Sequence, residues 1–419
     1  MNVFDIQVGV AITIAVADGS RAGRPAEVRY LDAWAEGVFG RPAKLHWLAD
    51  GSDAGRLPNA VPVPRKGLED FRPHPFGNGE WPSLRECFGF SKSGMKSGRD
   101  PIFVDADRDR LVRKVDEFLV QSGLPPHDPA LLRRLAYRPC DLRWFYNDLR
   151  LLNRPGPELQ RVWGADNVGF YALPGGTNAG PAVWCHSLLP DYHAIRGNNG
   201  GYAFPLHDRR PASAGFNLSS GLLAGLTALY GATIAPEEVF DAILCLLSAR
   251  SYTLRFAEDL EDTFPHVPFP ADHGVFQRAA GLGARIRAIQ TFAQAPAAAG
   301  DPAFVQLATV PSPGTVLDAG EPDGPCLTLC ADGSGRVEGL PATLWGFEVS
   351  RYPVLRRWLD GREGQTVDLA LFDAFRDVCG RIADLVDLFG QADTILFDAL
   401  DAPLTREAMW PTQKEPIDD

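Results

Sequence analysis

The chain has 419 residues and a formal net charge of −12, with 45% hydrophobic and 22% charged residues. This length predicts two or three domains of about 150 residues each, and the acidic balance argues against indiscriminate binding to nucleic acid. No apolar run of about 18 residues occurs and the N-terminus lacks a secretory signal, so neither a membrane span nor export is expected. Seven scattered cysteines, an odd number, do not suggest a disulfide framework, which favours a reducing cytoplasm.

The first hundred residues predict short strands and loops. Apolar residues alternate with small or polar ones from Phe4 to Val16, and this period of two predicts one long strand or two strands joined at Gly9. Two more strands are predicted, from Val28 to Tyr30 and from Leu45 to Leu48. A Pro- and Gly-rich linker or loop follows at 50–82, and a basic turn of small residues lies at 91–100.

Helical periodicity dominates later parts of the chain. The segment 160–235 predicts short strands and loops, including a strand from Tyr202 to Leu206, and 296–350 returns to loop and strand. Helices are predicted where apolar residues recur at three- and four-residue spacing between capping and stop signals: 106–120, from Pro236 to Leu247, from Leu254 to Leu260, from Asp272 to Phe292, from Pro353 to Gly361, and from Asp368 to Phe389 with an end at Gly390.

A basic, aromatic segment interrupts the acidic background. From Arg133 to Arg161 there are seven arginines and three acids, and residues 84–165 carry a net charge of +4, so the remainder sums to −16. Guanidinium groups supply forked donors for phosphates and guanine edges, and such asymmetry directs an anionic ligand to one surface. The alternative is a half-buried amphipathic strand whose arginines are only solvated.

Patterns for catalysis and metal binding are weak. The glycine-rich segment 174–180 lacks the Lys-Ser/Thr ending of a phosphate-binding loop and predicts a turn. Cys326 and Cys330 flank a strand-like triplet without a second pair to complete a zinc site. Cys185 and His193 form a candidate metal or nucleophile pair, with a packed cysteine and a surface histidine as the alternative. We therefore predict no catalytic residue and no metal ligand.

Five blocks, in order, resemble the C-terminal part of Type ISP restriction–modification enzymes and related adenine methyltransferases with a fused specificity domain. The third block, Tyr137-Arg138-Pro139-Cys140-Asp141-Leu142-Arg143-Trp144, is similar to the family's Tyr-Arg-Pro-Phe-Asp-x-Arg-Trp, with Cys140 in place of the usual Phe. The other blocks begin at Asn2, Ser93, Pro236 and Trp345.

The resemblance implies an α+β fold. It implies terminal strands of a methyltransferase-like sheet at 1–70, a connector at 71–125, a DNA target-recognition domain at 126–400 and a tail at 401–419. The family's S-adenosylmethionine turn and its Asn/Asp-Pro-Pro-Tyr/Phe segment lie upstream of the matched region and do not occur in this sequence. We therefore expect no cofactor in this chain, with S-adenosylmethionine bound by a missing methyltransferase half in a separate polypeptide or lost.

Three hypotheses follow. The first is a double-stranded DNA recognition module of an adenine-N6 methyltransferase, active in cytoplasmic phage defence, whose DNA contacts are Lys92, Lys96, Arg99, Arg138, Arg143, Arg150 and Arg154. Any of these arginines equally fits a structural pairing with Asp141 or Asp148. The second is a non-catalytic interaction protein that no longer binds DNA. The third is a small-molecule enzyme that uses Cys185 and His193.

Overall fold

The computed structural model describes residues 27–31, 38, 41–50, 61–62, 80–164, 166–195, 200–211 and 215–410. The chain divides into two compact units, Met1–Glu80 and Trp81–Asp419. In the first unit, β1 (Arg29–Tyr30) pairs antiparallel with β2 (Val61–Pro62), and α1 spans Arg41–Asp50. The predicted strand from Phe4 to Val16 lies outside the described residues.

Helix α1 corrects the predicted strand from Leu45 to Leu48. Pro42 stands in the first turn, where its fixed φ suits a helix start, and Ala43 and Lys44 are strong helix formers. The short apolar run was too brief to distinguish a strand from a helix by periodicity. The strand predicted near Tyr30 is confirmed as β1.

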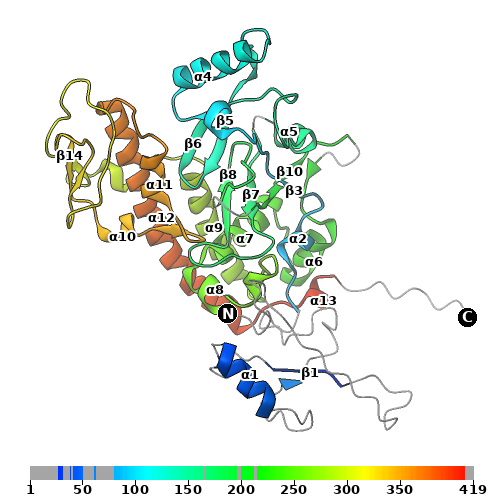
Figure 1. Cartoon of the computed structure of the whole chain (residues 1–419). Helices are drawn as coiled ribbons and strands as arrows, with labels where there is room; N and C mark the ends of the chain where they lie inside the picture. The colour runs from blue at the N-terminus through cyan, green and yellow to red at the C-terminus, as the bar shows by residue number, and fades with distance from the viewer. Residues whose placement is uncertain are drawn as a thin grey trace, which may run out of the picture. The chain divides into compact units, whose positions relative to one another are not determined.

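The second unit alternates short strands with helices (Figure 1). Its α-helices are α2 (Leu84–Cys87), α3 (Asp100–Phe103), α4 (Arg108–Gln121), α5 (Pro157–Trp163), α6 (Ser220–Tyr230), α7 (Pro236–Ser248), α8 (Arg250–Arg255), α9 (His273–Gln290), α10 (Ala342–Trp345), α11 (Val354–Asp360), α12 (Leu369–Asp401) and α13 (Arg406–Met409). Three 3-10 turns lie at Pro129–Leu131, Asp259–Glu261 and Ala298–Gly300.

All strand pairs of the second unit are antiparallel. A four-stranded sheet has the order β3 (Lys92–Ser93), β9 (Tyr202–Pro205), β7 (Gly169–Ala172), β8 (Val183–His186). A three-stranded sheet has the order β4 (Val104–Asp105), β6 (Asp141–Tyr146), β5 (Leu132–Arg138). Smaller sheets pair β10 (His207–Asp208) with β11 (Gly215–Phe216), β14 (Arg336–Glu338) with β12 (Gln306–Leu307) and β13 (Leu327–Thr328), and β15 (Glu348–Val349) with β16 (Tyr352–Pro353).

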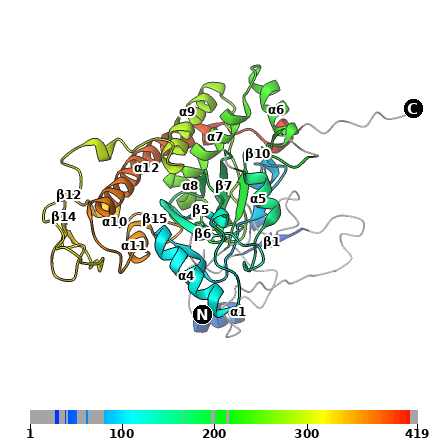
Figure 2. The same ribbon diagram turned by 90° about the horizontal axis from the view of Figure 1, so that it is seen from above.

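The main core lies between the four-stranded sheet and the helices. Phe170 of β7 stacks on Phe240 of α7 with ring centroids 3.9 Å apart, and Phe88 packs edge-on against both rings. Helices α7, α9 and α12 pack against one another behind the sheet (Figure 2). Judged by length and hydropathy, no described helix, the 33-residue α12 included, could span a membrane.

Most predicted helices are confirmed. The bounds of the helix predicted from Leu254 to Leu260 are corrected, because α8 ends at Arg255 and only a 3-10 turn at Asp259–Glu261 follows. Two further corrections concern α12 and α6. Helix α12 does not end at Gly390 but runs on to Asp401, because Ala392, Leu396 and Ala399 continue its buried stripe. Helix α6 was expected to be loop and strand. A Cβ on Gly225 of this helix would lie 2.0 Å from the backbone oxygen of Met409. The glycine, which in sequence indicates a loop, therefore allows the C-terminal segment to pack directly on the helix.

The basic, aromatic segment of the sequence forms the hairpin β5–β6. Arg138 pairs with Asp141 across the two-residue turn Pro139–Cys140, and Cys140 adopts a positive φ of 57°. Leu135 and Phe145 face a second core with α4, whose inner residues are Leu111, Val115 and Leu119. The predicted amphipathic strand is therefore two strands that share a buried face with α4.

The α+β fold class is confirmed. By packing, the chain divides between residues 80 and 81, and residues 81–125 belong to the same compact unit as the region after 126. Residues 402–410 also pack into this unit, since Met409 is fully buried and the Leu404 amide donates to Phe269. The sequence also predicted functional domains with boundaries at 70, 125 and 400, and these boundaries stay predictions.

Candidate nucleic-acid interface

Two segments far apart in the sequence form a short antiparallel ribbon on the second unit. The amide of Lys96 donates to the Arg154 oxygen, the amide of Arg154 donates to the Lys96 oxygen, and both N···O distances are 2.9 Å. The Asn153 amide adds a third bond to Ser97, 3.0 Å long. We name residues 96–99 and 151–154 the basic ribbon.

Cations of the ribbon rest on aromatic rings. Lys96 and Arg154 lie over the ring of Tyr192, with the charged groups 5.7 and 5.0 Å from its centroid. Arg99 lies over Phe118 of α4 and donates from Nη1 to the Leu151 oxygen at 3.3 Å. Such support fixes the cationic groups without neutralising them, because an aromatic ring carries no net charge.

Two further predicted cations stand next to the ribbon. Lys92 of β3 pairs with Glu158 at 3.0 Å, and Arg150 pairs with Asp148 at 2.6 Å. The hydrogen bond from Arg150 holds the pKa of Asp148 below its ordinary value. The Arg150 side chain is nevertheless 83% exposed. The Asp148 side chain is buried, whereas the Lys92 side chain is 53% exposed, so the exposed sides of both cations are available to a ligand.

Arg138 does not lie on this surface. Its side chain is only 6% exposed, and Nη1 donates to Asp191 Oδ1 at 2.7 Å. A buried, paired guanidinium has no face to offer a phosphate, and breaking such a pair costs more than a surface contact returns. We therefore remove Arg138 from the predicted DNA contacts and assign it a structural role.

Arg143 is also structural. Its side chain is 12% exposed and pairs with Asp141, which accepts a second guanidinium, that of Arg362, at 2.9 Å. Burial alone would raise the pKa of Asp141. The charges and hydrogen bonds of Arg362 and Arg143 have the larger effect, so the pKa of Asp141 lies below its ordinary value. The prediction of Arg143 as a DNA contact is corrected for the same reason as that of Arg138.

The hairpin motif connects to the ribbon through Tyr137. The guanidinium carbons of Arg138 and Arg143 lie 4.0 and 4.1 Å from the centroid of its ring, and burial raises its pKa to about 12. Its hydroxyl donates to Asp100, which also accepts the Ser97 hydroxyl of the ribbon. The motif that first suggested DNA contacts thus holds the ribbon in place.

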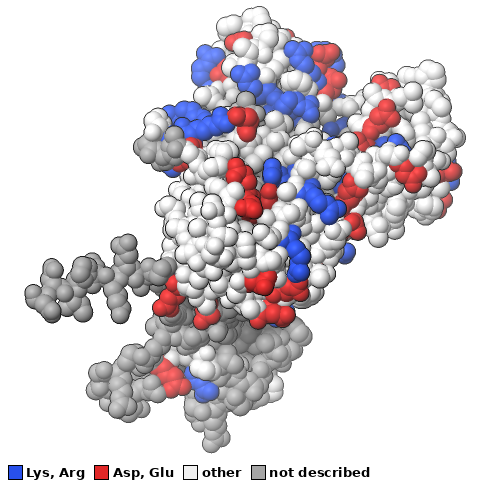
Figure 3. Space-filling model, turned by 180° about the vertical axis from the view of Figure 1, so that it is seen from behind, with Lys and Arg blue, Asp and Glu red and all other residues white. Residues whose placement is uncertain are grey.

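The structure also shows residues that the sequence did not single out. Tyr192 and Asp191 support the ribbon from a distant loop, and no local pattern marks them. Arg210 lies over the ring of Phe90 at 4.5 Å and 3.8 Å from Glu158, the partner of Lys92. Lys and Arg side chains gather in the upper part of one face of this unit (Figure 3), where α4 is found in Figure 1.

The candidate pair Cys185 and His193 has no catalytic geometry. Cys185 is buried in β8, and burial raises the pKa of its thiol far above the ordinary value, so the nucleophilic thiolate is disfavoured. His193 Nδ1 lies 3.8 Å from Asp191, and burial is the main cause that lowers its pKa. Among the described residues, no three His, Cys, Asp or Glu side chains are grouped to hold a metal ion.

Fold and surface together define an α+β protein in which a buried arginine network supports a cationic ribbon. A family model described as the Type ISP C-terminal specificity domain matches residues 119–379, more than half of the chain. The chain therefore belongs to the family of Type ISP C-terminal specificity domains. A search of curated proteins found no match.

Solved structures share this fold at low identity. They include a cryo-EM structure of a DrdV–DNA complex, with 18% identity and a TM-score of 0.56, covering 74% of this chain and 36% of that chain. A nuclease-deletion mutant of the Type ISP restriction–modification enzyme LlaGI, in complex with a DNA substrate mimic, has 14% identity, a TM-score of 0.57 and coverages of 89% and 39%. The ATP-dependent Type ISP restriction–modification enzyme LlaBIII, bound to DNA, has 12% identity, a TM-score of 0.58 and coverages of 87% and 27%. This chain thus spans well under half the length of each.

Proposed function

We propose that this chain recognises a specific sequence in double-stranded DNA for a restriction–modification enzyme. The observation that carries the proposal is the basic ribbon, a cluster of supported cations on a chain whose net charge is −12. Membership of a specificity-domain family supports it, and so do similar folds that were solved with DNA.

The ribbon and its neighbours bind phosphates in this proposal. Lys92, Lys96, Arg99, Arg150 and Arg154 come from two adjacent segments, and contacts of this kind fix the register of a protein on duplex DNA. The buried pairs of Arg138 and Arg143 hold the ribbon and touch no DNA. The acidic remainder of the surface repels the duplex and so restricts binding to one face.

In this proposal the chemistry belongs to a methyltransferase. We propose that a separate methyltransferase polypeptide, with bound S-adenosylmethionine, flips the target adenine and methylates its N6 while this chain holds the flanking sequence. We place this activity in the cytoplasm, as part of phage defence. This chain itself then carries no catalytic residue.

The test uses the full chain and fluorescence anisotropy with labelled duplexes. Arg154→Ala and Arg99→Ala should each weaken binding to every duplex by a similar factor, because phosphates carry no sequence information. Arg336→Ala, on the small sheet of β14, is the matched control and should bind as the parent does. Parent-like binding by the Arg154 and Arg99 variants over several salt concentrations would reject the proposed interface.

A second function, docking of a protein partner without DNA binding, has one observation in its favour. Residues 301–348 carry seven acids and one arginine, around the small sheet of β12, β13 and β14. Such a surface suits a basic protein partner better than a phosphate backbone. Absence of any binding to random duplex at low salt would favour this second function over the first.

A further inference from the structure

The ribbon contains one side chain that the charge argument overlooks, Asn153. Asparagine presents a donor and an acceptor together, and it forms a bidentate pair with the N6 and N7 atoms of adenine in the major groove. Lysine and arginine carry donors only, so they cannot make this pair with adenine. An asparagine among phosphate-binding cations is therefore the natural candidate for a base contact.

The backbone of Asn153 is held firmly. Its amide donates to the Ser97 oxygen at 3.0 Å, next to the two bonds that join Lys96 to Arg154. Gly98, with a φ of +74°, packs so closely that a Cβ on it would lie 2.5 Å from the Cβ of Asn153. The glycine thus leaves room for Asn153 at this position. A base contact needs such placement, since an amide must meet two atoms of one base edge.

The amide of Asn153 differs from those of the other asparagines in the described part of the chain. Asn147 exchanges two hydrogen bonds with Gln160, Asn167 and Asn217 donate to backbone carbonyls, and the side-chain oxygen of Asn178 is buried. Asn153 is the exposed member of this group, and no hydrogen bond of its side chain is found within the described residues. Its donor and acceptor are therefore free to pair with a ligand.

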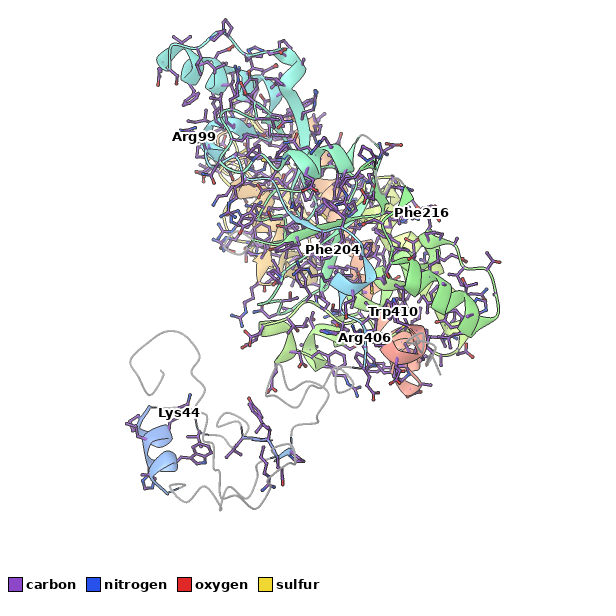
Figure 4. All side chains as sticks on the ribbon, turned by 90° about the vertical axis from the view of Figure 1, so that its right-hand side faces the viewer. Lys44, Arg99, Phe204, Phe216, Arg406 and Trp410 are labelled. Carbon is purple, nitrogen blue, oxygen red and sulfur yellow. The ribbon has the colours of Figure 1, made fainter. Side chains whose placement is uncertain are left out.

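The surroundings of Asn153 suit a groove. A two-stranded ribbon fits the major groove of B-form DNA. Lys96 and Arg154 lie on the paired positions beside Asn153, and Arg99 lies at the ribbon's end, near the outer edge of the unit (Figure 4). Phosphate contacts from these cations would flank the groove that the ribbon enters.

We infer that Asn153 is a specificity-determining residue that reads an adenine in the major groove of the recognised duplex. The inference rests on the proposed function and deepens it, because it assigns sequence reading to one side chain and positioning to the cations around it. The adenine is one of the recognised base pairs, and the donor and acceptor of the amide pair with its N7 and N6 groups.

Selection from a randomised duplex pool by the full chain tests the inference. The parent should select a sequence with at least one preferred adenine, by about 5- to 150-fold over other bases. Asn153→Ala should lose that preference alone and keep the parent's affinity for unrelated duplex and its salt dependence. In Asn153→Asp, the carboxylate accepts only, so the adenine preference should again be lost and cytosine should gain. Gln294→Ala, an exposed amide after α9, is the matched control and should select as the parent does.

The outcomes separate the inference from the proposed function. If Asn153→Ala selects the parent's sequence, the inference is overturned while the proposed function stands. If it weakens binding to all sequences equally, Asn153 contacts the backbone and the inference also fails. If the parent itself shows no sequence preference, the proposed function fails and removes the basis of the inference. Unfolding midpoints equal to the parent's would establish that the variants remain folded.

Discussion

At the scale of single residues, the decisive distinction is between buried and exposed arginines. Asp141 accepts hydrogen bonds from Arg143 and Arg362, and each of these three side chains is no more than 12% exposed. Arg150 forms a similar pair with Asp148 but projects into solvent. The same residue type in the same stretch of sequence is thus buried in the fold in one case and exposed to solvent in the other.

Removing the charge of Asp141 should destabilise the fold. In Asp141→Asn two buried guanidiniums lose their counter-charge, which should lower the free energy of unfolding by about 3–5 kcal/mol in urea titrations at neutral pH. The folded-state pKa of Asp141 lies below its ordinary value. Its stabilisation is therefore complete above about pH 4 and is lost as the pH falls through the folded-state pKa, so the difference between the variant and the parent should shrink in acid. Asp109→Asn, at an exposed site, is the control and should have the same free energy of unfolding as the parent. If Asp141→Asn also unfolds with the parent's free energy, the account is contradicted.

Arg138 and Arg150 should give opposite results. Arg138→Met leaves Asp191 buried and unpaired, so the free energy of unfolding should fall by about 3 kcal/mol or more. Arg150→Ala removes the hydrogen bonds to Asp148 but from an exposed guanidinium, so the free energy of unfolding should fall much less than in Arg138→Met. It should also reduce the slope of log K against log salt for duplex DNA by about 0.9. Equal effects of the two variants on stability would remove the distinction between them.

Charge alone selected a region of sequence but could not separate its buried cations from its exposed ones. Three of the seven predicted cations, Lys96, Arg99 and Arg154, lie in the ribbon, and Lys92 and Arg150 stand next to it. The partner of Arg138, Asp191, lies 53 residues away in sequence. Arg143 pairs with the neighbouring Asp141, but Arg362, which binds the same carboxylate, is 221 residues from Asp141. No window of local sequence contains such pairings.

At the scale of elements, close backbone contacts set the position of the ribbon. A Cβ on Gly94 would lie 2.4 Å from the Asp191 oxygen and 2.9 Å from the Tyr192 Cα, so the segment before the ribbon packs directly on the loop that carries Tyr192. Since both neighbouring atoms belong to backbone, a side chain at Gly94 requires the two segments to separate.

Gly94→Ala should therefore disturb binding as well as stability. We expect the free energy of unfolding to fall by about 1–3 kcal/mol and DNA affinity to fall with it, because the ribbon moves relative to Tyr192. At Gly89 an added Cβ would meet its nearest atom at 3.7 Å, an ordinary contact. Gly89→Ala is thus the control, and urea titration with anisotropy measures both properties. Unchanged affinity in Gly94→Ala would mean that the ribbon is not the binding element.

Two glycines of α9 should respond in opposite directions. A Cβ on Gly283 would lie 1.8 Å from the Asp241 oxygen of α7, so Gly283→Ala should force these helices apart and lower the melting temperature. Gly281 has no atom within 4 Å of the added Cβ, and Gly281→Ala should stabilise the helix by about 0.5–1 kcal/mol. A destabilising Gly281→Ala, or a neutral Gly283→Ala, would contradict the described packing.

Elements with strong local signals were predictable from sequence. Asp272 caps α9 and Pro236 begins α7 as their residue types indicate, and Gly361 follows α11. The end of α12 and the whole of α6 were missed for a shared reason. Glycine signals a stop or a loop locally, whereas tertiary packing in these helices overrides its low propensity. The C-terminal segment that packs on α6, with Arg406 and Trp410 labelled in Figure 4, gives no sign of this contact in sequence.

At the scale of the whole molecule, the proposed function depends on an uneven charge distribution. Residues 84–165 sum to +4 while the remainder sums to −16. Long-range repulsion from the acidic remainder lowers affinity for duplex DNA, and the ribbon must offset it locally. Binding should therefore be strong only in one orientation, as the proposed role in DNA recognition requires.

The salt dependence of DNA binding by the full chain tests this account most directly. Five phosphate contacts from Lys92, Lys96, Arg99, Arg150 and Arg154 release condensed counterions, so log K against log salt should fall with a slope of about −4.5. A slope near zero, or no binding to duplex DNA at low salt, would contradict the claim that these cations form a DNA-binding surface.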